Sequence, residues 1–127
     1  EVAARPRMRF RSLGSGSSGN ATVVESGGAR PTRLLVDCGF SLRELETRLG
    51  RAGLAAGDID AVFATHEHGD HVGCAATFAR RHRVPLWTSH GTWRAVGEPD
   101  CGDGLLNFAR DGERIAVSQR DALPRIL

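Results

Sequence analysis

The 127-residue chain lacks the features that mark membrane, disulfide-rich and repeat proteins. None of its apolar runs approaches the roughly 20 residues that a membrane-spanning helix needs, so we expect no membrane partner. Its three cysteines, Cys38, Cys74 and Cys101, are an odd number, and their spacing matches neither a disulfide framework nor a paired CxxC zinc site. This cysteine usage favours a reducing, cytoplasmic setting.

The chain also has no lysine: all 17 of its basic residues are arginine. Its formal net charge is only +2. A charge this small does not by itself indicate nucleic-acid binding. The hydrophobic content of 40% is typical of a globular domain. Residues 1–7 contain no apolar core of a secretory signal, so we interpret them as an N-terminal extension and residues 8–127 as one domain.

The first third of the chain has the pattern of β-strands. Apolar and polar residues alternate over residues 8–13, and strand-like runs follow at 20–25 and 32–37. Turns rich in glycine and serine separate these runs. Together they predict an antiparallel β-meander.

Helix and strand signals alternate after residue 40. Ser41 and Glu44 form a capping box that starts a helix, and Gly53 is a typical helix stop. The later patterns predict strands and helices in this order: strand 60–65, helix 72–83, strand 84–88, helix 92–96 and strand 114–117. Because a helix between two strands favours parallel pairing, we expect an α/β fold.

The run from His66 to His71 carries four potential metal ligands: His66, His68, Asp70 and His71. Residues two apart on a helix point away from each other, so the run is expected to be a loop. Such a loop can direct His66 and His68 at one ion and the other two residues at a second ion. It follows the strand at 60–65, and α/β sheets place ligand sites at the carboxyl ends of strands. The alternative is a histidine-rich loop that arose by chance.

The pattern His-x-His-x-Asp-His, preceded by Leu-Leu-Val-Asp-Cys-Gly at 34–39, closely resembles the metallo-β-lactamase fold hydrolases. Residues 10–20 and the later Gly-Thr-Trp at 91–93 are similar to the WalJ-type branch, which is regarded as a group of DNA exonucleases. This resemblance covers residues 8–117. It implies an αββα sandwich fold, of which this chain would form only the N-terminal βα half.

The resemblance also implies a functional site. It assigns His66 and His68 to a first metal, and Asp70 and His71 to a second, with Asp70 as the catalytic residue. Asp37 becomes a supporting residue that steadies the histidine loop. The implied cofactors are two divalent metal ions, zinc first, with manganese or iron as alternatives. The implied reaction is hydrolysis of a phosphodiester in a nucleic-acid substrate by a metal-bound hydroxide.

Members of this family are much longer and take further ligands from their second half, whereas no such motif is recognisable after residue 111. A second hypothesis is therefore a non-catalytic, truncated fragment that binds at most one metal weakly. Such a fragment would expose a β-sheet face and self-associate through it. A third is a homodimer that completes the site. His90, which follows the strand 84–88, remains open as a substitute ligand, a helix cap or an exposed residue.

For the other distinctive side chains, a structural role is the favoured interpretation. We expect Cys38 and Cys74 to be small buried thiols. Trp87 and Trp93 are expected in the core, and His82 as a solvated surface residue at a helix end.

Overall fold

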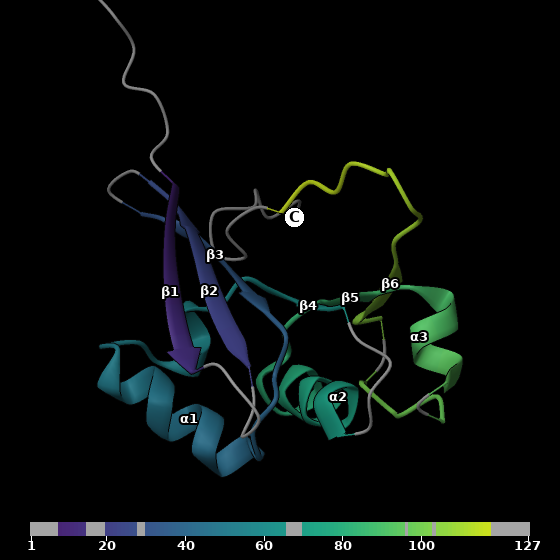
Figure 1. Ribbon diagram of the computed structural model, residues 1–127, viewed down its shortest axis with the longest axis horizontal. Helices are drawn as coiled ribbons and strands as arrows, with labels where there is room; N and C mark the ends of the chain where they lie inside the picture. The colour runs from purple at the N-terminus through teal and green to yellow at the C-terminus, as the bar shows by residue number, and fades with distance from the viewer. Residues whose placement is uncertain are drawn as a thin grey trace, which may run out of the picture.

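The computed structural model describes residues 8–14, 20–27, 30–65, 70–95, 97–102 and 104–117, and of residues 70–73 it describes the backbone alone. These residues form a six-stranded sheet with three α-helices and one 3-10 turn (Figure 1). The elements in chain order are β1 (Met8–Gly14), β2 (Ala21–Ser26), β3 (Thr32–Val36), α1 (Leu42–Arg51), the 3-10 turn (Ala56–Asp58), β4 (Ala61–Ala64), α2 (Asp70–His82), β5 (Leu86–Thr88), α3 (His90–Ala95) and β6 (Leu106–Phe108).

The strands are arranged in the sheet in the same order as in the chain, from β1 to β6. β1, β2 and β3 pair antiparallel, which confirms the predicted meander. From β3 to β6 every pair is parallel, which confirms the parallel pairing expected from the strand–helix–strand order. The parallel half therefore brings the carboxyl ends of four strands to one edge of the sheet.

Local sequence explains both ends of α1. The Ser41 hydroxyl accepts a hydrogen bond from the Glu44 amide at 3.2 Å, as the capping box predicts. The Glu44 carboxylate pairs with Arg48 one turn later, at 2.8 Å, rather than returning to the cap. Gly53 follows the helix with a φ of 78°, a left-handed conformation that glycine adopts without a steric cost. Leu45 lies fully buried on the inner face of this helix.

The prediction of a strand at 114–117 is wrong. Within the described residues the last strand is β6, which pairs in parallel with β5. The Leu86 amide donates to the Leu105 carbonyl at 2.8 Å, so β6 already occupies the free edge of β5. Ile115 and Val117 alternate with polar or small residues as in a strand, and positions 114 and 116 are exposed, but the segment 114–117 has no regular secondary structure.

The two faces of the sheet differ in how they are covered. Figure 1 shows α1 and α2 together on one face. The strand residues Val23, Leu35 and Val62 are fully buried in one core cluster with residues of these helices, Leu45 and Phe78. The strand register places Phe10 in line with Val24 on the opposite face, where Phe10 is 68% exposed. Within the described ranges no helix covers this second face. The apolar sheet face expected from the resemblance is therefore present, and its self-association stays a prediction.

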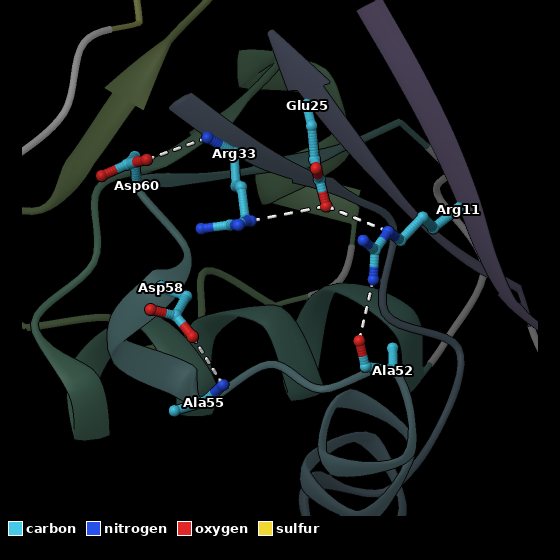
Figure 2. Close-up of polar contacts among 7 residues, drawn as sticks. All are labelled: Arg11, Glu25, Arg33, Ala52, Ala55, Asp58 and Asp60. Atoms are coloured by element: carbon cyan, nitrogen blue, oxygen red, sulfur yellow. Dashed lines mark hydrogen bonds and ion pairs between the residues drawn. The ribbon is translucent and has the colours of Figure 1, made fainter. Parts of the chain in front are cut away.

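A buried carboxylate ties the first three strands together on the helix side (Figure 2). Glu25 of β2 is 4% exposed, and its Oε1 atom lies 3.1 Å from Arg11 Nε and 3.4 Å from Arg33 Nε. Arg11 also donates to the Ala52 carbonyl at the end of α1, at 2.8 Å. The Arg33 amide donates to the Asp60 carboxylate at 2.8 Å. These contacts fix β1, β3, α1 and the approach to β4 relative to one another.

Candidate metal centre

The candidate site is built where β3 and β4 end side by side. These strands are parallel neighbours with Val36 opposite Phe63, so the residues that follow them emerge at the same edge. Asp37 directly follows β3, and its amide donates to the Phe63 carbonyl at 2.8 Å. Thr65 directly follows β4 and directly precedes His66. The strand pairing thus places Thr65, the residue before the histidine run, beside Asp37.

Asp37 holds Thr65 with both carboxylate oxygens. Its Oδ1 accepts from the Thr65 amide at 2.8 Å, and its Oδ2 accepts from the Thr65 hydroxyl at 2.6 Å. Asp37 is 9% exposed and has a φ of 63°, a left-handed conformation that Asp adopts more readily than most residues. The residue before His66 is therefore held by two hydrogen bonds to the Asp37 carboxylate. The role of Asp37 in steadying the histidine loop stays a prediction.

The structure separates the four predicted ligands into two groups. His66 and His68 lie outside the described residues, whereas Asp70 and His71 are the first two residues of α2. The expectation of a loop throughout 66–71 is therefore wrong for its last two positions. An acidic residue is favoured in the first turn of a helix, where it interacts with the helix dipole, and this is a reason for α2 to begin at Asp70.

The donor set matches the chemistry of a divalent transition metal. Imidazole nitrogens and a carboxylate suit zinc, manganese and iron, and the segment that carries them runs between two fixed points, Thr65 and the start of α2. Among the described side chains no cluster of three or more His, Cys, Asp or Glu residues that could hold a metal ion is present. The assignment of metal ligands to the run 66–71 stays a prediction.

A cavity of about 360 Å³ opens at the same sheet edge. Thr65, Ser89 and Ala109, the residues that follow β4, β5 and β6, all contribute to its lining. The charged residues of its wall come from one segment after β6: Arg110, Asp111 and Glu113. Sequence reasoning missed this segment because its membership in the site depends on β6, which the pattern did not reveal.

His90 lies just after β5, the strand next to β4, as expected. Its ring packs within a group of aromatic side chains. It is the first residue of α3, and its ring lies 4.5 Å from Phe108 and 6.0 Å from Trp93, centroid to centroid. Trp93 and Trp87 are only half-buried, so the expectation that both belong to the core is wrong.

His82 is not the solvated residue that its basic neighbours suggested. Its Nε2 lies 2.8 Å from the Glu46 carboxylate of α1, and its ring packs against Phe78 with centroids 4.8 Å apart. His82 thereby joins the end of α2 to α1, because helix packing brings Glu46 beside it.

Cys38 and Cys74 lie close to the site and close to each other. Cys38 directly follows Asp37 and is fully buried, as expected, whereas Cys74 is half-buried on α2. Their sulfur atoms are 2.7 Å apart. The proximity of two cysteines 36 positions apart had no signal in the sequence.

Comparison with known proteins gives a consistent family. Residues 14–113 match the sequence model of the metallo-beta-lactamase superfamily. The chain is 35% identical over 89 residues to exodeoxyribonuclease YycJ of Bacillus anthracis, a match that covers 70% of this chain and 33% of that protein. It is 33% identical over 116 residues to ribonuclease Z of Mycobacterium sp. (strain KMS), covering 82% of this chain and 39% of that protein. The chain thus spans about a third of the length of these curated relatives.

Solved structures share the fold at low sequence identity. The Rm3 metallo-beta-lactamase superposes with a TM-score of 0.64 at 21% identity, covering 85% of this chain and 45% of that chain. The metallo-beta-lactamase SMB-1 in complex with mercaptoacetic acid gives a TM-score of 0.63 at 16% identity, covering 91% and 50% respectively. The α/β architecture described above therefore corresponds to about half of a metallo-beta-lactamase fold. Together with the match over residues 14–113, this shows that the chain belongs to the metallo-beta-lactamase superfamily.

Proposed function

We propose that this chain carries the metal-binding part of a metal-dependent hydrolase that cleaves phosphodiesters in nucleic acid. The observation that carries the proposal is the pair of hydrogen bonds from Thr65 to Asp37, which holds the residue before the His66–His71 run at the edge of a cavity. Relatives named exodeoxyribonuclease and ribonuclease Z support the substrate class. The name of a relative is an argument by analogy, so the substrate needs a direct test.

Each ligand has a separate role in this proposal. His66 and His68 would hold the first metal ion, and Asp70 and His71 the second, with zinc as the favoured metal. When bound, such ions lower the pKa of water from about 15.7 towards 7 and supply a nucleophile at neutral pH. Asp37 would contribute by positioning, because it holds Thr65, the residue before His66, with two hydrogen bonds.

The charge of the cavity wall agrees with a metal requirement. One arginine, Arg110, stands against two carboxylates, Asp111 and Glu113, so these three residues together do not attract a phosphate. Divalent cations beside them would reverse the sign of the local charge and admit a phosphodiester. Arg110 would then contact a phosphate oxygen of the bound strand. This arrangement predicts that nucleic-acid binding, and not only cleavage, depends on metal.

The alternative is metal binding without hydrolysis. Catalytic zinc usually has three protein ligands, whereas the run supplies only His66 and His68 to the first ion. A weakly held single ion is the expected result if no further ligand is provided.

Metal content and cleavage, measured on the same preparation, test the proposal. The chain is purified without chelator, metal per chain is determined by elemental analysis, and end-labelled DNA and RNA oligonucleotides are incubated with zinc or manganese. The test variant is His66→Ala/His68→Ala. The matched control is His90→Ala, which removes a histidine from the end of the neighbouring strand.

We expect close to two ions per chain and metal-dependent cleavage, both lost in the double variant and retained in the control. At most one weakly held ion with no cleavage would establish the alternative, metal binding without hydrolysis. Two ions with no cleavage of DNA or RNA would show that the proposed nucleic-acid substrate is wrong. Cleavage retained by the double variant would show that the assignment of His66 and His68 is wrong. A large loss of metal in the control would identify His90 as a ligand.

A further inference from the structure

Two cysteines outside the proposed ligand set lie in direct contact. Cys38 Sγ and Cys74 Sγ are 2.7 Å apart, and neither is in a disulfide. A disulfide requires a sulfur–sulfur distance of about 2.05 Å and closely spaced backbones. The two sulfur atoms therefore need to move by less than an ångström towards each other to reach bonding distance.

The two thiols differ in their surroundings. Cys38 is fully buried, and its contact with Cys74, together with burial, raises its pKa above the usual value for a thiol. Cys74 is half-buried, and the same contact with Cys38 lowers its pKa, although burial and the charge of Glu46 act against this shift. The thiolate is the nucleophilic form of cysteine, so the reactive thiol is also the accessible one. The buried thiol of Cys38 lies close enough to Cys74 to attack its sulfur atom once Cys74 has formed a mixed disulfide.

We propose that Cys38 and Cys74 form a reversible intramolecular disulfide by exchange with a low-molecular-weight disulfide of the glutathione class. The Cys74 thiolate attacks one sulfur of that disulfide, which forms a mixed disulfide on Cys74 and releases one thiolate. Cys38 then loses its proton and attacks the Cys74 sulfur, which releases the second thiolate. Two protein thiols are oxidised and one small disulfide is reduced to two thiols, so electrons and protons balance.

The position of this pair gives the disulfide a consequence for the site. Thr65, which Asp37 holds, directly precedes the segment 66–69, and Asp70, the first residue of α2, directly follows it. Cys38 is the neighbour of Asp37, and Cys74 lies one turn into α2. The disulfide would therefore fix the distance between the two ends of the metal-binding run. It concerns thiols of the chain itself and does not depend on the proposed hydrolase activity.

Thiol counting and peptide mapping test this proposal on the full chain. The reduced protein is incubated with glutathione disulfide in the presence of EDTA, which prevents metal-catalysed oxidation. Free thiols are counted after denaturation, and a tryptic digest is mapped by mass spectrometry without reduction. Cleavage after arginine places Cys38 in peptide 34–43, Cys74 in peptide 52–80 and Cys101 in peptide 95–110. Every disulfide pairing therefore gives a different linked mass.

We expect free thiols to fall from three to one per chain, with peptides 34–43 and 52–80 linked and dithiothreitol restoring all three. In Cys38→Ala, Cys74 should stop at the mixed disulfide and retain one glutathione per chain. The control Cys101→Ser should form the same link as the natural chain. Three free thiols after incubation, a link to peptide 95–110, or a link between two chains would each overturn the proposal. The count on the natural chain decides the question even if a variant does not fold.

Discussion

Replacement of Asp37 tests whether one carboxylate organises the sheet edge. In Asp37→Ala both hydrogen bonds to Thr65 are lost, and alanine must adopt the φ of 63° that Asp37 has. Asp37→Asn keeps an oxygen that accepts from the Thr65 amide and an amide group that can donate to the hydroxyl. Asparagine also tolerates the left-handed conformation. The pair of variants therefore separates loss of the bonds from loss of charge.

The magnitude follows from the bonds and the backbone. A hydrogen bond to a charged group contributes about 1.5–3 kcal/mol, and the lower end applies because Thr65 is exposed and water can solvate it. Two bonds give about 3 kcal/mol, and the left-handed backbone adds roughly 1 kcal/mol for alanine. We expect the free energy of unfolding to fall by about 4 kcal/mol in Asp37→Ala. In Asp37→Asn we expect a fall of about 1 kcal/mol, since two neutral bonds remain.

Urea unfolding followed by tryptophan fluorescence, with EDTA present, measures these differences. A slope near 2 kcal/mol per molar urea converts 4 kcal/mol into a midpoint lower by about 2 M. The control is Asp58→Asn, because Asp58 accepts a single backbone hydrogen bond, from Ala55 at 2.8 Å, in an exposed position. Its unfolding free energy should change by less than about 1 kcal/mol. If Asp37→Ala lies within 1 kcal/mol of the natural chain, or if Asp37→Asn is equally damaging, the reasoning fails.

The remaining predictions concern the ion cluster, the core and the cavity. Glu25→Ala removes the carboxylate that Arg11 and Arg33 share at a buried position, so the free energy of unfolding measured with urea should fall by about 3 kcal/mol. A fall below about 1 kcal/mol would show that these ion pairs contribute little to stability. Leu45→Ala should cost about 3 kcal/mol in the same assay, whereas the exposed Met8→Ala should change stability by less than 0.5 kcal/mol. Arg110→Ala should weaken metal-dependent DNA binding and reduce the slope of log K against log salt by about 1; an unchanged slope would remove Arg110 from the interface.

The parts of the fold that local chemistry determines were predictable from the sequence. Ser41 and Gly53 marked both ends of α1 because a cap and a left-handed stop require particular residue types. The alternation over residues 8–13 and the strand-like runs at 20–25 and 32–37 likewise predicted the meander. Asp37 was singled out through resemblance. The structure shows its two hydrogen bonds to Thr65, and its role beside the histidine run stays a prediction.

The parts that depend on long-range contacts were not predictable. Residues 114–117 have a better strand pattern than β6, yet β6 forms because Leu105 and Leu106 reach the open edge of β5. The contact of Cys38 with Cys74, and that of Glu46 with His82, depend on how α2 packs against its neighbours. No local pattern records such packing, and the charged segment beside the cavity was missed for the same reason.

The one-sided cover of the sheet also bears on how this chain responds to temperature. The heat capacity of unfolding rises with the apolar surface that becomes hydrated, and per-residue averages give about 1.5–1.9 kcal/mol/K for a chain of this length. Met8 and Phe10 are already 62% and 68% exposed in the folded state, so their hydration changes little on unfolding. The heat capacity change should therefore fall below that range, and the curve of stability against temperature should be flatter than for a fully enclosed domain of equal length.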